Sequence, residues 1–263
     1  MTYKKYLRIY SIFLKNAISY EAQYRKDTWI RLCFSVLWMG MTFLFVEVLF
    51  THTESIGGWT KEHLYTLTFF WIFVDELTVT LFQKTTEIPS LVTDGTLDFY
   101  FTKPVSALFL VTTERISVRG VWRLVIELAL FVFFWAHFDF SPTATQAGLA
   151  ILLLLAGLVV SYSVRLLLNT LSFWFYRIDN INDLWISFSD AGKYPLHILP
   201  KTLRILFLSF VPVAFSAYIP ASAFFGLVAW YGVAYAFLFS AFIFLASLLL
   251  WNVAVKRYTS ASS

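Results

Sequence analysis

The strongest constraint on this chain is a series of long apolar runs separated by polar segments. The first run covers residues 30–50, and a helix of that length, rising about 1.5 Å per residue, spans a hydrocarbon core of about 30 Å. Of the 263 residues, 59% are hydrophobic and only 14% are charged, and the mean hydropathy is +0.70. Soluble domains carry about one quarter charged residues. The sequence therefore predicts an all-α integral membrane protein.

The order of these runs predicts six transmembrane helices in a domain over residues 29–255. Five of them are placed at residues 30–50, 64–83, 118–136, 147–175 and 223–255. Two alternatives exist for the fifth helix in chain order. In one, residues 177–193 are a cytoplasmic loop and residues 202–219 form the span. In the other, residues 180–192 form a short crossing buried in protein, and a re-entrant outer hairpin follows within residues 193–222, because irregular backbone at membrane depth is tolerated only against protein or water.

The distribution of basic residues predicts the topology. Lysine and arginine cluster before the first span and follow the last one at Lys256 and Arg257, whereas the loops at residues 51–63 and 137–146 hold a single lysine and no arginine. Because cytoplasmic loops carry the excess of these residues, both termini are expected in the cytoplasm, the C-terminal one as a tail over residues 256–263. The basic residues form no continuous stripe, so lipid is an expected partner and nucleic acid is not.

Residues 1–28 are predicted to form a cytoplasmic amphipathic helix. At about 100° per residue, one face carries Lys4, Arg8 and Lys15, and the opposite face carries Ile9 and Phe13. This pattern is typical of a helix lying on an anionic membrane surface. A helix whose apolar face packs on the protein's own cytoplasmic loops shows the same pattern, so both alternatives remain.

The polar segment at residues 84–117 is the longest part of the chain that must lie in water or at an interface. Asp94 and Gly95 form a turn signal, and Pro104 is suited to open a short helix that continues to about Arg115. Long ordered connections usually have a function. We interpret the segment as a cytoplasmic coupling element that a partner pushes; the alternative is a solvated loop with an interfacial helix.

Four of the ionisable residues in the predicted spans are candidate site residues. Asp75 and Glu76 lie near the middle of the second span, Glu127 lies in the third, and Arg165 lies near the inner boundary of the fourth. Because an ionisable group at that depth costs a few kcal/mol, each is expected to face a partner or a cavity. They are candidates for a polar transport path, or for structural ion pairs, with Arg165 either reaching the interface or pairing with Glu127.

Several chemistries are absent from the sequence. It contains no P-loop motif, no serine-hydrolase or zinc-protease motif, and no metal-ligand spacing among its four histidines and single cysteine. We therefore expect no catalytic residue, metal site or cofactor in this chain. An intramembrane enzyme would need more clustered polar groups than the three acidic residues of the spans.

Five segments in order resemble the permease subunits of type-2 ABC exporters, in particular the six-span branch of uncharacterised bacterial ABC permeases. VTDGTLDFYFTKPVSALF is similar to the family's cytoplasmic G-x-L-D-x-x-L-x-x-P signature. Gly95, Leu97, Asp98 and Pro104 stand on the matching positions, and Phe101 stands where leucine is usual. The other four segments are ISYEAQYRKDTWI, GWTKEHLY, LSFWF with the following proline-rich stretch, and LWNVAVKRYTSASS.

The resemblance implies a permease of the bacterial cytoplasmic (inner) membrane that exports a substrate using ATP and Mg held by a separate dimer of ABC ATPase subunits. It also implies a second permease, identical or related, and favours the re-entrant hairpin. The residues expected to couple to the ATPase are Gly95, Asp98, Phe99, Tyr100, Phe101, Pro104 and Leu108. Among them Asp98 is expected to fix the structure of the loop, and the aromatic residues and Leu108 are expected to dock on the ATPase.

The alternative function is a membrane scaffold or channel without nucleotide coupling. Aromatic-rich walls suit an amphiphilic cargo, although lipid-facing surfaces have the same composition.

Overall fold

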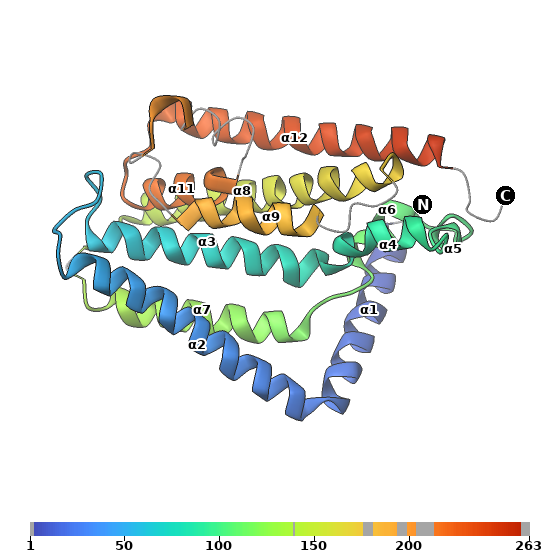
Figure 1. The fold of residues 1–263 in the computed structure, drawn as a ribbon, viewed down its shortest axis with the longest axis horizontal. Helices are drawn as coiled ribbons and strands as arrows, with labels where there is room; N and C mark the ends of the chain where they lie inside the picture. Colours follow the sequence, from blue (N-terminus) through green and yellow to red (C-terminus); the bar gives the residue numbers. More distant parts are fainter. Residues whose placement is uncertain (1–2, 139, 176–180, 194–198, 204–212, 259–263) are drawn as a thin grey trace.

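The computed structural model describes residues 3–138, 140–175, 181–193, 199–203 and 213–258, and these residues are almost entirely helical (Figure 1). The only pairing of β type among them is an isolated bridge between Ile56 and Trp59. The helices are α1 (Tyr3–Gln23), α2 (Arg25–Phe50), α3 (Lys61–Phe82), α4 (Ile88–Thr93), α5 (Asp98–Phe101), α6 (Ala107–Thr113), α7 (Val118–Trp135), α8 (Ala144–Thr170), α9 (Ile181–Asp190), α11 (Val213–Phe224) and α12 (Trp230–Arg257). Three 3-10 turns accompany them, η1 (Gln83–Glu87), η2 (Leu171–Phe173) and η3 (Ala191–Lys193).

The predicted all-helical class is confirmed for the described residues, and four helices have the length and composition needed to cross a membrane. They cover Lys26–Phe50, Lys61–Thr93, Ala144–Phe173 and Trp230–Arg257, and they match the predicted first, second, fourth and last spans. The third predicted span corresponds to α7, which is shorter and carries Arg119, Arg123 and Glu127. Both described chain ends lie at one end of the bundle, called here the terminal end (Figure 1).

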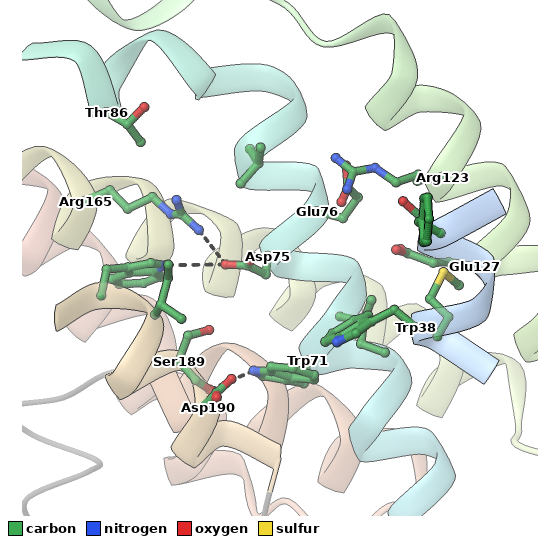
Figure 2. Close-up of a pocket in the computed structure, with 17 residues that line it drawn as sticks. Trp38, Trp71, Asp75, Glu76, Thr86, Arg123, Glu127, Arg165, Ser189 and Asp190 are labelled. Carbon is green, nitrogen blue, oxygen red and sulfur yellow. Dashed lines mark hydrogen bonds and ion pairs between the residues drawn. The ribbon is translucent and has the colours of Figure 1, made fainter. Parts of the chain in front are cut away.

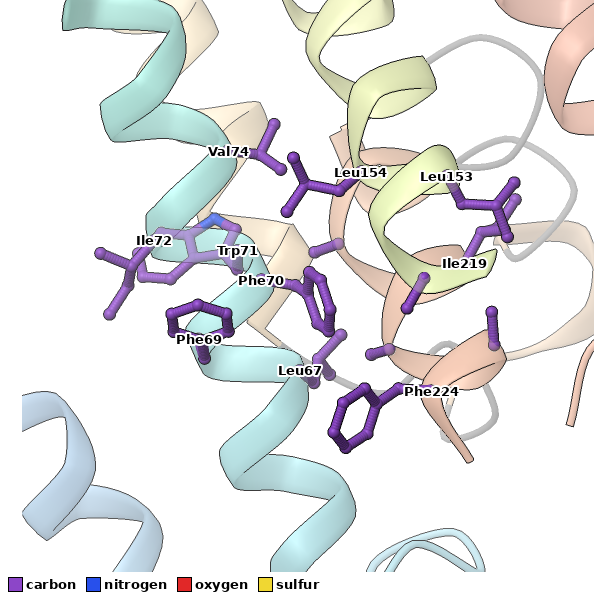
Figure 3. Packing of buried hydrophobic residues seen from close by; sticks show 14 of the residues in the cluster. Leu67, Phe69, Phe70, Trp71, Ile72, Val74, Leu153, Leu154, Ile219 and Phe224 are labelled. Atoms are coloured by element: carbon purple, nitrogen blue, oxygen red, sulfur yellow. The ribbon is translucent and has the colours of Figure 1, made fainter. Parts of the chain in front are cut away.

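The bundle is organised around α3, which packs against α2, α7, α8 and α11. Its apolar side chains point in all directions, as expected of a helix buried in a protein core. Figure 3 shows Leu67, Phe70 and Val74 of α3 facing Leu154 of α8 and Phe224 of α11. Because α3 lies between α7 and α8, polar residues on those two helices meet α3 before they meet each other (Figure 1).

The region of the disputed fifth span is partly described. Helix α9 packs against α8 and α11, Trp185 is buried, and the indole Nε1 of Trp71 in α3 donates to the Ser189 carbonyl oxygen at 2.7 Å. The contacts of Trp185 and Ser189 agree with the alternative in which this segment is buried in protein, whereas Ile186 of the same helix is exposed. The choice between the two alternatives stays a prediction. The expected hairpin at residues 193–222 lies largely outside the described residues.

Helix α1 runs across the terminal end of the bundle rather than along it (Figure 1). Its predicted apolar face packs on the connection between α3 and α7: the Tyr6 and Phe109 rings meet edge to face at 4.9 Å, and Ile9 and Phe13 contact the core of that connection. This favours the alternative in which the helix packs on the protein's own loops. A second strip of α1, including Leu7 and Ile18, stays exposed.

Candidate functional site

A cavity of about 650 Å³ lies among α2, α3, α7, α8 and α9 (Figure 2). It brings together the four ionisable residues predicted within the spans. Its lining includes Asp75, Glu76, Glu127 and Arg165, together with Arg123, Asp190 and the three tryptophans Trp38, Trp71 and Trp185. Pockets of this size and mixed lining are typical of small-ligand sites. The role of Asp75, Glu76, Glu127 and Arg165 in a transport path stays a prediction.

Asp75 and Arg165 form an ion pair on one side of the cavity. The Arg165 Nη2 atom lies 2.5 Å from the Asp75 Oδ1 atom, and the Trp185 Nε1 atom donates to the same oxygen at 3.4 Å. The guanidinium lies over the Trp185 ring, 4.6 Å from its centroid. Both alternatives predicted for Arg165 are therefore wrong: it is buried rather than extended to an interface, and it pairs with Asp75 rather than Glu127 because α3 lies between α8 and α7.

Glu76 forms a second ion pair on the opposite side of α3, as Figure 2 shows. Its Oε1 atom lies 2.8 Å from the Arg123 Nη2 atom and accepts from the Thr80 hydroxyl at 3.2 Å. The approach is close because Gly120 of α7 packs directly on Thr80 and Glu76. Arg123 is not among the site residues predicted from the sequence. Its position four residues before Glu127, on the same helical face, was the signal for a site residue.

Glu127 differs from the other two carboxylates of the spans. Its side chain is only 3% exposed, and its Oε2 atom is buried without a hydrogen-bond partner among the described residues. The structure shows no ion pair between Glu127 and another helix among the described residues. The described residues also contain no group of three or more His, Cys, Asp or Glu side chains suited to hold a metal ion.

The connection between α3 and α7 (residues 83–117) is a folded unit. Its core residues Ile88, Leu97, Leu110 and Val111 pack with Leu166 of α8 and Trp251 of α12. The predicted turn at Gly95 is confirmed, since its φ of 68° is one that glycine adopts readily. The helix expected to open at Pro104 begins instead at Ala107, because the Ser106 hydroxyl caps it by accepting from the Phe109 amide.

The three aromatic residues expected to dock on a partner are not equivalent. Phe99 is 67% exposed and Phe101 is 38% exposed, but Tyr100 is buried. The Tyr100 hydroxyl donates to the Glu114 Oε2 atom at 2.6 Å, and burial followed by this bond raises the pKa of Tyr100. The docking role predicted for Tyr100 is therefore wrong. The Tyr100 ring belongs to the core of the connection. Leu108 is half-buried and packs against the same core.

Replacing Tyr100 by phenylalanine should lower the free energy of unfolding by about 1 to 2 kcal/mol, since a buried bond to a carboxylate is lost. The measurement is the thermal midpoint of the purified protein in detergent. Tyr231→Phe is the control, because the Tyr231 ring is exposed at the start of α12. Equal midpoints for Tyr100→Phe and the control would show that the hydroxyl bond contributes nothing.

The connection also contacts the last helix and the first one. The Phe101 and Tyr258 rings lie 5.9 Å apart, and burial, then the neighbouring Asp98 carboxylate, raises the pKa of Tyr258. On the other side, the Lys5 Nζ atom donates to the Pro104 carbonyl oxygen at 3.0 Å. A displacement of the connection would therefore be passed to α1, α8 and α12 together.

Comparison with known proteins agrees with the geometry. No curated protein matches the chain. A family model described as ABC-2 family transporter protein matches residues 36–262, which include the cavity residues, the α3–α7 connection and α12. This match and the long apolar helices make the chain a multi-pass membrane protein. Because the match covers far more than half of the sequence, the chain belongs to the ABC-2 family of transporter proteins.

Proposed function

We propose that this chain is the transmembrane permease subunit of an ATP-binding-cassette exporter. It crosses the bacterial inner membrane six times, with α7 and the α9 region as the third and fifth crossings, and both termini lie in the cytoplasm. A dimer of ABC ATPase subunits holds ATP and Mg, and a second permease, identical or related, completes the complex. The cavity among α2, α3, α7, α8 and α9 forms part of the substrate path.

The observation that carries this proposal is the construction of the α3–α7 connection. Phe99 and Phe101 are exposed at the terminal end of the bundle, where a cytoplasmic partner would dock. The core of the same connection is shared with Leu166 of α8 and Trp251 of α12. A partner that binds the exposed rings differently in two states therefore changes the equilibrium between two arrangements of the long helices.

The α3–α7 connection is also held at both of its ends, so that it moves as a unit. Arg115 pairs with Glu87 across the connection, and the Ser117 amide donates to the Thr80 carbonyl oxygen of α3 at 3.1 Å. The Arg119 Nε atom, at the start of α7, lies 3.1 Å from the Glu21 Oε1 atom of α1. These contacts tie the connection to α3, and the start of α7 that follows it to α1, in addition to the helices that share the core of the connection.

Changing Phe99 and Phe101 together to glutamate should reduce co-purification of the ATPase subunit by at least about ten-fold, because two desolvated charges replace apolar contacts at the centre of the interface. The tagged chain is purified in mild detergent from its host, and the bound ATP-binding protein is quantified. Ser90→Glu is the control: it adds one charge of the same sign at an exposed position of the same connection.

Stoichiometric co-elution of an ATP-binding protein with the unmodified chain and with Ser90→Glu, and its loss from the double variant, supports the exporter. If the unmodified chain brings down no ATP-binding protein, the alternative of a channel or scaffold without nucleotide coupling replaces it. If the double variant retains a full complement of ATPase, the docking surface has been assigned to the wrong residues.

A further inference from the structure

The charges that line the cavity do not balance within the described residues. Asp75 is paired with Arg165, Glu76 with Arg123, and Asp190 with Lys193 at 2.8 Å. Glu127 is left over, with one buried carboxylate oxygen that has no partner there. A buried carboxyl group without a partner avoids the cost of a buried charge by taking up a proton, and a bound cation allows it to ionise instead.

The tryptophans of the cavity already bind cations of the protein itself. Arg165 lies over the Trp185 ring at 4.6 Å, and the Lys193 Nζ atom lies over the Trp71 ring at 4.7 Å. Trp38, whose ring is 6.0 Å from that of Trp71, is 51% exposed. It has no such cation above it among the described residues, so its face is open to a ligand.

Trp38 and Glu127 lie on the same side of the cavity, between α2 and α7 (Figure 2). Part of the wall around them is apolar and comes from Met39 and Phe34 of α2 and Ile72 of α3. Arg123 and Glu76 also lie on this side of the cavity, and their charges are paired with each other at 2.8 Å. A cation held here meets a carboxylate and an aromatic face at once, and its hydrocarbon groups meet the apolar wall. A cation is attracted to the face of a tryptophan ring, and the attraction strengthens as both are removed from water.

We propose that this cavity binds an organic monocation with aromatic or branched apolar substituents, with its charged centre between the Glu127 carboxylate and the Trp38 ring. Within the proposed function this class of compound is the substrate, so the assignment rests on that function where it speaks of transport. Binding itself does not depend on the ATPase. An anion is disfavoured: Arg165 also has a buried Nε atom without a partner, but its charge is balanced by Asp75 at 2.5 Å.

The test compares two probes of the same shape and opposite charge, tetraphenylphosphonium and tetraphenylborate. Binding to the purified full chain in detergent is measured by equilibrium dialysis, with empty micelles subtracted. We expect saturable binding of the phosphonium with one site per chain and no saturable binding of the borate. Glu127→Gln, which keeps the shape and removes the charge, should weaken phosphonium binding at least ten-fold.

Glu47→Gln is the matched control, because Glu47 is also a carboxylate of a long helix but pairs with Lys61 at 2.6 Å and does not line the cavity. It should leave the affinity unchanged. Trp38→Leu should weaken binding several-fold and Trp38→Phe much less, which tests the site even if Glu127→Gln does not fold. Unchanged phosphonium affinity in Glu127→Gln, or in Trp38→Leu where only that variant folds, would overturn the proposal, as would equal saturable binding of the borate.

The two proposals fail separately. A chain that binds the phosphonium but recruits no ATP-binding protein refutes the exporter and leaves the cation site in place. A chain that recruits the ATPase through Phe99 and Phe101 but binds neither probe supports the exporter and refutes the cation site. Glu127→Gln should co-purify with the ATPase as the unmodified chain does, because Glu127 lies outside the α3–α7 connection.

Discussion

Replacing Arg165 by methionine should destabilise the protein by about 3 kcal/mol, because the change leaves Asp75 without its ion partner inside the bundle. This is the lower end of the range for a broken buried pair, since the Arg165 side chain is 10% exposed but that of Asp75 is 38% exposed to the cavity. Trp185 alone would remain within hydrogen-bond distance of the carboxylate, at 3.4 Å. For a chain of this size the thermal midpoint in detergent should fall by about 6 to 12 °C.

The double variant Asp75→Asn with Arg165→Met separates the lost charge pair from lost packing. It removes both charges, so most of the stability should return, as it does when a buried pair is replaced by neutral groups. Lys61→Met is the control: its partner Glu47 and Lys61 itself are both more than one third exposed, and such pairs contribute about 0 to 1 kcal/mol. If Arg165→Met and Lys61→Met had the same midpoint, the Asp75–Arg165 pair would not stabilise the bundle.

The long helices could be predicted from the sequence because the requirement that produces them is local. Residues 30–50 and 223–255 are predominantly apolar, and a membrane demands this of any span regardless of its neighbours. Helix α9 does not satisfy that requirement by itself. Its burial depends on Trp71 of α3, which bonds to Ser189, and on the Asp75–Arg165 pair beneath Trp185. No property of residues 181–190 taken alone contains that information.

The pairing of the ionisable residues shows the same limit. Position along a span predicts the depth of a charged group. The structure places Asp75, Glu76, Glu127 and Arg165, which were predicted to lie at such depth, in the lining of one cavity. Position along a span does not predict which helices are neighbours, so the partner named for Arg165 was wrong. In the α3–α7 connection, consecutive aromatic residues differ in burial although their types are alike, because the short helix α5 turns Tyr100 inward and Phe99 outward.

Gly157 of α8 lies directly against the backbone of α11. A methyl group added to Gly157 of α8 would lie 2.9 Å from the Cα atom and 3.0 Å from the carbonyl oxygen of Ser216 in α11. Small residues permit such close approach between helices in membranes. Because the neighbouring atoms belong to backbone, they cannot rotate away as a side chain would.

Gly157→Leu should therefore abolish folding of the bundle, at a cost above about 4 kcal/mol, and Gly157→Ala should cost about 1 to 3 kcal/mol, as overpacking of a core does. Helix α11 packs mainly on α8, so separating the two helices also removes the support of α9. Gly148→Leu is a control within the same helix, because no atom of a neighbouring element lies within 4 Å of a Cβ atom added there. The measurement is the monodisperse fraction recovered after size-exclusion chromatography in detergent: near zero for Gly157→Leu, reduced for Gly157→Ala and unchanged for Gly148→Leu. Equal recovery of the two leucine variants would mean that α8 and α11 do not approach each other at Gly157.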